Sequence, residues 1–92
     1  MKKYKLKISA EAISDIQEIT NWYNQQANRL GKRFQKTTIR QINSLDKTPQ
    51  EFAIRYHEIR CSIIKNFPYM VHFYVNEKNQ TVEVLAVIST SR

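Results

Sequence analysis

The chain has 92 residues, with 15 Lys and Arg against 8 Asp and Glu, and therefore carries a formal net charge of +7 at neutral pH. This length suffices for a single domain, predicted to span residues 1–92, and is too short for two. A hydrophobic content of 41% with one Gly and two Pro excludes a disordered basic tail. The excess of positive charge favours an anionic partner, either a nucleic acid or an acidic protein surface.

Residue usage excludes several kinds of site. The single cysteine, Cys61, cannot form an internal disulfide, and together with two histidines it makes no recognisable zinc set. Gly31 is the one glycine of the chain, which excludes a glycine-rich phosphate-binding loop. We therefore expect no metal and no cofactor. Because no stretch approaches the roughly 18 apolar residues of a membrane span, and no apolar segment follows the basic N-terminus, we expect a cytoplasmic protein with no targeting segment and no membrane partner.

The first two predicted elements are a strand and a helix. From Tyr4 to Ile8 large apolar residues alternate with lysines, which is the period-two pattern of a half-buried strand. Ser9 is the predicted N-cap of a helix that runs from about Ala10 to Ala27, with acidic residues in its first turns. At helical spacing its apolar face comprises Ile13, Ile16, Thr20, Tyr23 and Ala27.

A second helix is predicted from near Leu30 to about Asp46, and Pro49 follows because proline disfavours helical backbone before it. Its apolar face comprises Leu30, Phe34, Thr38, Ile42 and Leu45. Its opposite side carries five cations, Arg29, Lys32, Arg33, Lys36 and Arg40. A short polar connector between the two helices predicts an antiparallel hairpin whose apolar side needs cover from another element.

Three strands are predicted after a loop or short strand at 50–57. They span Ile59 to Lys65, Tyr69 to Val75 and Thr81 to Ile88, and short turns join them, so they are antiparallel neighbours. The residues predicted to face the core are Ile59, Cys61 and Ile63 in the first strand, Tyr69, Val71, Phe73 and Val75 in the second, and Val82, Val84, Ala86 and Ile88 in the third. The predicted fold is α+β, with an N-terminal strand and an antiparallel two-helix hairpin packed on one face of a mainly antiparallel β-sheet.

The other face of the sheet is predicted to carry the functional groups. We expect Arg60, His72 and Tyr74 there, flanked by Lys65 and Arg92, because a guanidinium fork, an imidazole and a ring suit phosphate recognition. His72 is the strand residue whose chemistry suits proton transfer near neutral pH, whereas Cys61 is predicted to be a small core residue.

Helix residues supply two further candidates. The cations Arg33, Lys36 and Arg40 are predicted to contact the target. Trp22 falls on the polar side of the first helix, where it either laps half-buried over a neighbouring element or anchors a protein partner.

Six segments in order along the chain carry a further signal: Ile8 to Ala12, Asp15 to Ile19 leading to Trp22 and Tyr23, Gly31 to Phe34, Leu45 to Pro49, Ile59 and Arg60 followed by Phe67 to Tyr69, and Val82 to Ser89. Their order and spacing resemble the RelE/ParE superfamily of bacterial toxins. The resemblance covers nearly the whole chain and implies the fold inferred above. It also implies a cognate antitoxin that wraps and neutralises the toxin in a hetero-oligomer.

The superfamily divides by target. RelE-like toxins cut messenger RNA in the ribosome with basic residues, including an arginine that matches Arg60, and often with an acid/base group near the C-terminus. ParE-like toxins block DNA gyrase and lack the nuclease set. Here Arg60 and Arg92 match, but the segment from Ser89 to Arg92 offers no general base.

The resulting prediction is the toxin of a type II toxin–antitoxin module of the plasmid stabilisation type, which inhibits growth by binding an essential target such as DNA gyrase. One alternative is a ribosome-dependent mRNA endoribonuclease of RelE type, with Arg60, His72 and Arg92 as the catalytic groups around the phosphate. A further alternative is a non-toxic basic nucleic-acid-binding module that uses the helix cations.

Overall fold

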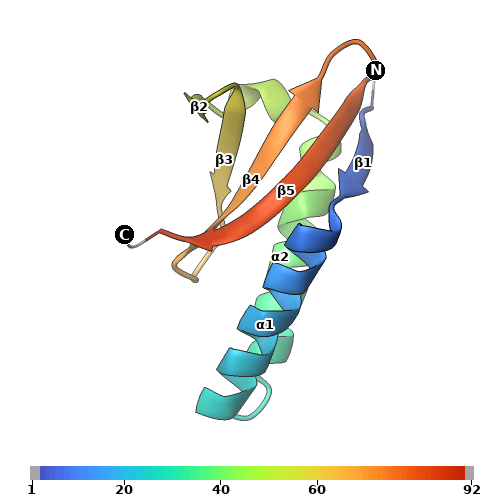
Figure 1. The fold of residues 1–92 in the computed structure, drawn as a ribbon. Coiled ribbons are helices and arrows are strands. Elements are labelled where there is room, and N and C mark those ends of the chain that lie inside the picture. Colours follow the sequence, from blue (N-terminus) through green and yellow to red (C-terminus); the bar gives the residue numbers. More distant parts are fainter. Residues whose placement is uncertain (1–2, 91–92) are drawn as a thin grey trace.

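The computed structural model describes residues 3–90, and Figure 1 shows two helices packed against one five-stranded sheet. The sheet order is β1-β5-β4-β3-β2, in which β1 lies parallel to β5 and all other neighbours are antiparallel. The elements are β1 (Lys5–Ile8), α1 (Ala10–Gln26), α2 (Leu30–Asn43), two 3-10 turns (Ser44–Asp46 and Pro49–Glu51), β2 (Ile54–Tyr56), β3 (Ile59–Ile63), β4 (Tyr69–Asn76) and β5 (Thr81–Ser89). The predicted α+β fold is confirmed, although the second helix ends at Asn43, earlier than predicted.

The start of α1 is tied to the sheet. Ser9 is the N-cap, as predicted, and its Oγ accepts the Ala12 N–H at 3.0 Å while donating to the Leu85 carbonyl, also at 3.0 Å. One turn further along, the Asp15 carboxylate accepts the N–H of Val87 at 3.0 Å. These two contacts join the first turns of α1 to β5 and set how α1 is rotated about its axis.

This rotation corrects one predicted face. Ile13 was expected in the core but is 57% exposed, and Ala12 is fully buried in its place. Because Asp15 turns toward β5, Ala12 rather than Ile13 faces the core at the start of α1. Ile16, Thr20 and Tyr23 are buried as predicted.

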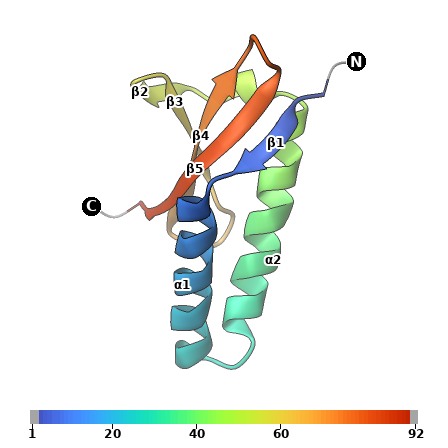
Figure 2. The same ribbon diagram turned by 45° about the vertical axis from the view of Figure 1, so that its right-hand side comes forward.

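The predicted buried face of α2 is largely confirmed, and Figure 2 shows α1 and α2 running side by side. Phe34, Thr38 and Ile42 are fully buried. Phe34 lies in an aromatic cluster with Tyr23, Phe67 and Tyr69. The ring centroids are 5.2–6.2 Å apart, and most of the ring pairs meet edge to face. Such pairs contribute about 0.5–1.5 kcal/mol each beyond burial, so this cluster joins the helix hairpin to the sheet.

The faces of β3 are opposite to those predicted. Ser62 and Ile64 are buried, whereas Ile63 is 62% exposed. The reason is the register, which pairs Ser62 with Val71, a core residue of β4. Residues directly opposite each other in an antiparallel pair point to the same side, so Ser62 faces the helices.

A β-bulge changes the phase of β5. Phe73 pairs with Val84 and His72 pairs with Ala86, so Leu85 is an extra residue between them. Val82 and Val84 face the core as predicted, but beyond the bulge Val87 takes the core position, and the predicted core positions of Ala86 and Ile88 are wrong.

Gly31 permits the close approach of the two helices. A Cβ at this position would lie 2.2 Å from the Thr20 carbonyl oxygen and 2.5 Å from the Asn24 side-chain oxygen, which accepts the Gly31 N–H at 2.9 Å. The first of these atoms belongs to the backbone of α1 and cannot turn aside. Any side chain here must push the two helices apart.

Replacing Gly31 with Ala should therefore lower the free energy of unfolding by about 2–3 kcal/mol, although Ala alone favours a helix by about 1 kcal/mol. Urea unfolding measures the change. Gln35→Ala, at an exposed position of the same helix, is the control and should change stability by about 0.5 kcal/mol or less. A stability gain in Gly31→Ala would contradict the close approach.

Candidate functional site

The sheet face turned away from the helices is the first candidate surface. We call it the open sheet face, and the strand pairing places on it Ile59, Cys61, Ile63, Met70, His72, Tyr74, Glu83, Ala86 and Ile88. Of the groups predicted there, His72 and Tyr74 are present. Lys65 is exposed in the turn after β3, and that turn lies beside the end of β5 because the Thr90 N–H donates to the Pro68 carbonyl at 2.9 Å.

Arg60 is not on the open sheet face, which corrects the prediction. It pairs with Phe73, a fully buried core residue, and therefore points to the helix side of the sheet. Its Nη1 donates to the backbone carbonyls of Gln50, at 3.1 Å, and Phe52. Arg60 is half-buried, and both of its hydrogen bonds to these carbonyls come from Nη1. Arg92 lies outside the described residues.

The turn that holds Arg60 is itself anchored at two points. The Gln50 amide donates to Glu77 Oε2 at 3.1 Å, and Glu77 Oε1 accepts the hydroxyl of Tyr4 at 2.9 Å. The Phe52 ring packs edge-on against Phe73, with centroids 5.7 Å apart. The anchoring residues lie far along the chain from this turn. The amino-acid sequence alone therefore could not predict that the Gln50 and Phe52 carbonyls accept hydrogen bonds from Arg60.

His72 is on the predicted face but is only 7% exposed. The Tyr56 hydroxyl lies 2.8 Å from its Nδ1, and the Tyr56 ring is tilted by 58° against the imidazole with centroids 5.7 Å apart. Its Nε2 is buried without a hydrogen-bond partner among the described residues. Burial, and to a lesser degree the nearby Arg55 guanidinium, lowers the pKa of His72, so this ring is neutral at pH 7.

Cys61 was predicted to face the core, and the structure places it beside His72 instead. Its Sγ lies 3.6 Å from His72 Nδ1, and the side chain is half-buried. Burial raises the pKa of this thiol, and the Arg55 charge offsets only part of that effect. A thiol that stays protonated is a poor nucleophile, so this pair lacks the usual features of a reactive cysteine site.

An apolar row at one end of the open sheet face was not anticipated. Ile63, Met70 and Ile88 are cross-strand neighbours, and the two isoleucines are 62% and 46% exposed. The sequence did hold a signal, since Ile63 and Ile64 are consecutive and one of them must point outward in any strand. Exposed apolar rows of this kind suit protein contact.

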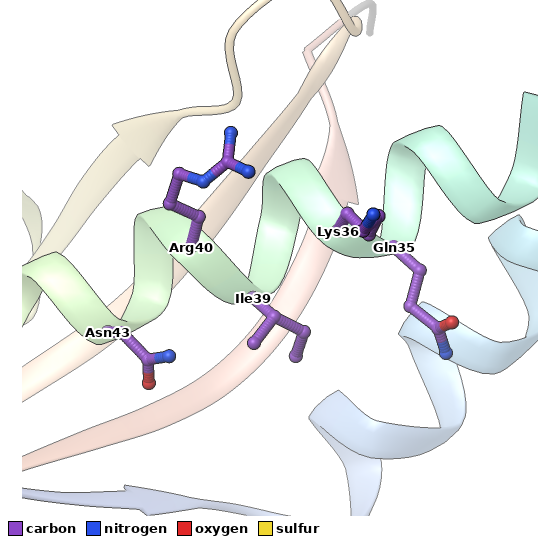
Figure 3. A pocket seen from close by; sticks show the side chains of 5 residues that line it. All are labelled: Gln35, Lys36, Ile39, Arg40 and Asn43. Atoms are coloured by element: carbon purple, nitrogen blue, oxygen red, sulfur yellow. The ribbon is translucent and has the colours of Figure 1, made fainter.

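The second candidate surface is on α2. We call the set Arg29, Lys32, Arg33, Lys36 and Arg40 the basic stripe, and all five side chains are exposed. A hollow of about 320 Å³ is lined by the first four. A second hollow, of about 450 Å³, is lined by Lys36 and Arg40 together with Gln35, Ile39 and Asn43. In Figure 3, Arg40 extends to one side of the helix, and Gln35, Ile39 and Asn43 extend to the other.

Trp22 is 51% exposed on α1, so about half of its side chain is buried and half faces outward. Its ring meets Tyr23 edge-on with centroids 5.1 Å apart, which holds the indole at the surface. A large, partly exposed indole held in place in this way is available to a protein partner.

Residues 3–90 contain no group of three or more His, Cys, Asp or Glu side chains placed to hold a metal ion. Among the same residues, no helix is both long enough and apolar enough to cross a membrane.

Comparison with known proteins identifies the family. Residues 6–92 match the family described as ParE toxin of type II toxin-antitoxin system, parDE. The chain therefore belongs to the ParE toxin family. A search of curated protein sequences found no match.

Solved structures share the fold at low sequence identity. The chromosomal ParDE TA system from P. aeruginosa superposes with a TM-score of 0.84 at 16% identity, over 96% of this chain and 97% of the other. The intact E. coli RelBE toxin-antitoxin complex gives 0.71 at 14% identity, over 97% and 99%. The RelBE2 complex from Mycobacterium tuberculosis gives 0.69 at 14% identity, over 95% and 98%.

The burial of His72 predicts a pH dependence of stability. Folding lowers the pKa of His72 from its ordinary value of 6.5. Below about pH 6.5 the imidazole is therefore protonated more fully in the unfolded chain than in the folded chain. The free energy of unfolding is thus at its full value, as far as His72 is concerned, above about pH 6.5, and it decreases as the pH falls toward the folded-state pKa. His72→Gln should flatten this decline, as measured by urea unfolding between about pH 7.5 and about pH 5.

The matched control is His57→Asn, which removes the other histidine at an exposed position where φ is 43° and Asn is well tolerated. This variant should keep the decline of the parent protein. Equal flattening in both variants would show that the effect does not come from the buried imidazole.

Proposed function

We propose that this protein, a ParE-family toxin, arrests growth by binding and inhibiting DNA gyrase in the cytoplasm, and that a cognate antitoxin neutralises it in a hetero-oligomer. The observation that carries the proposal is the family match over residues 6–92. The blocking of gyrase is what the ParE branch of the superfamily implies for this chain.

The geometry of the candidate groups supports inhibition by binding rather than RNA cleavage. Attack by a 2′-hydroxyl on phosphorus needs a group that accepts a proton and a cation that stabilises the developing charge. His72 Nδ1 lies against Tyr56, and its Nε2 is buried. Arg60 donates hydrogen bonds to the Gln50 and Phe52 carbonyls. Neither group is presented to a phosphate in this arrangement.

Exposed groups on the sheet suit a protein target. The apolar row of Ile63, Met70 and Ile88 offers area for burial, and Lys65 supplies a charge in the turn beside it. Tyr74 adds a ring at the other end of the open sheet face. Interfaces take most of their binding energy from such buried apolar and aromatic anchors.

A cognate antitoxin is supported by what the structural relatives are, since the P. aeruginosa and E. coli matches are toxin–antitoxin systems. With a net charge of +7, this chain favours an acidic partner segment. We assign Trp22 as an anchor for that segment because it is large, half-exposed and held by Tyr23.

Adding the purified protein to gyrase and relaxed plasmid should block supercoiling, because the toxin acts by occupying the enzyme. Addition of the antitoxin, encoded by the neighbouring gene, should restore supercoiling. Induction in the natural host should raise DNA-damage signalling while transcripts remain intact. New transcript ends within codons, together with unimpaired supercoiling, would contradict the proposal and favour the endoribonuclease.

Truncating Trp22 to Ala should weaken antitoxin binding by about 30-fold, the effect of losing a hot spot worth about 2 kcal/mol. Isothermal titration with the antitoxin measures the change, and thermal unfolding of the free protein checks that the fold is intact. Gln25→Ala, exposed on the same helix, is the control and should bind normally. Unchanged affinity in the Trp22 variant would remove this residue from the interface.

A further inference from the structure

The two helices of the hairpin differ sharply in charge. No acidic residue occurs between Glu18 and Asp46, and the five side chains of the basic stripe are all exposed. Within residues 3–90 none of these five side chains takes part in an ion pair or a side-chain hydrogen bond. A surface that serves solubility alone intersperses both signs, whereas a field of one sign attracts a polyanion.

The stripe is straight. Arg33, Lys36 and Arg40 recur at intervals of three and four residues, which keeps them on one side of α2, and Arg29 precedes them at the N-cap of the helix. At about 1.5 Å per residue, neighbouring members stand about 4.5–6 Å apart and the whole row is about 17 Å long. Duplex DNA carries one negative charge per about 1.7 Å of its axis, so a row of this length faces several phosphates.

The surface around the stripe is also hollowed. Lys36 lines both hollows, so the two are neighbours along α2. Gln35 and Asn43 add amide groups to the second hollow, where Figure 3 shows them beside Ile39. Amide side chains and cations together are the groups that proteins use to contact phosphate oxygens.

We propose that the basic stripe of α2 binds the phosphate backbone of duplex DNA. The stripe contacts backbone charge rather than base edges, so this binding is independent of DNA sequence. The inference goes beyond the gyrase proposal because it concerns a surface of this chain that needs no enzyme to bind DNA.

The composition of the stripe favours a duplex over the other polyanions. Single-stranded nucleic acids are held by stacking on exposed aromatic rings, and Phe34, the one aromatic residue in α2, is fully buried. An acidic protein segment needs apolar anchors, and the two hollows offer only Ile39, which is 38% exposed. The apolar row on the open sheet face suits such a segment better.

Fluorescence anisotropy with a labelled DNA duplex, across a series of salt concentrations, tests the proposal. Four phosphate contacts predict that the logarithm of the affinity falls with the logarithm of salt with a slope of about −3.6. The triple variant Arg33→Gln, Lys36→Gln, Arg40→Gln should bind at least about tenfold more weakly, with a slope shallower by about 2.7. Circular dichroism checks that each variant is folded.

The control is the triple variant Lys5→Gln, Lys7→Gln, Lys78→Gln, which removes the same charge from exposed positions on β1 and the β4–β5 turn. It should keep most of the affinity and the slope. Lys36→Arg, which keeps the charge, should bind as the parent does.

Three outcomes would overturn the proposal. Equal losses in both triple variants would mean that net charge alone attracts the DNA. Equal affinity for single-stranded RNA would remove the preference for a duplex. A stripe variant that binds DNA normally but loses the antitoxin would assign the stripe to the acidic protein. Because gyrase is absent, failure here leaves the supercoiling assay to decide the proposed function separately.

Discussion

The pairing of β3 with β4 is the constraint on which the arrangement of functional groups depends. Ser62 opposite Val71 turns the even-numbered residues of β3 to the helices, and Gln41 of α2 holds this register by donating to the Ser62 hydroxyl at 2.6 Å and to the Ile63 carbonyl. A slip of one residue would exchange the two faces of the strand. It would bury Ile63, expose Ser62 and carry Arg60 to the open sheet face.

With this register, the groups that suggest acid–base chemistry are used for structure. The guanidinium of Arg60 links β3 to the turn at 49–52, and the imidazole of His72 supports Tyr56 at the sheet edge. Buried polar groups that are paired in this way hold an edge strand in place, but they are not free to meet a substrate. A ParE-family toxin that acts by occupying its target needs no such group, which agrees with the proposed inhibition of gyrase.

The helix hairpin separates two kinds of surface. The apolar row of the open sheet face can bury area against a protein, while the basic stripe on α2 carries charge and little exposed apolar area. Gly31 allows the helices to pack closely enough for Phe34 to reach the aromatic cluster, and this contact leaves the cations of α2 directed outward. The same packing thus stabilises the fold and exposes both surfaces.

The spacing of apolar residues was sufficient to predict a buried face wherever that face depends on neighbouring residues alone. The buried face of α2 and the core face of β4 were predictable because residues close together in the sequence define the helical and strand periods. The phase of β3 was not, since the consecutive Ile63 and Ile64 fit either face, and the bulge at Leu85 and the rotation of α1 by Asp15 depend on β5 contacts. The amino-acid sequence therefore determined the elements, the charge and the family, whereas only the tertiary structure decided on which face Arg60 lies and that His72 is buried. Pairing between distant segments sets register and burial, and local spacing contains no information about it.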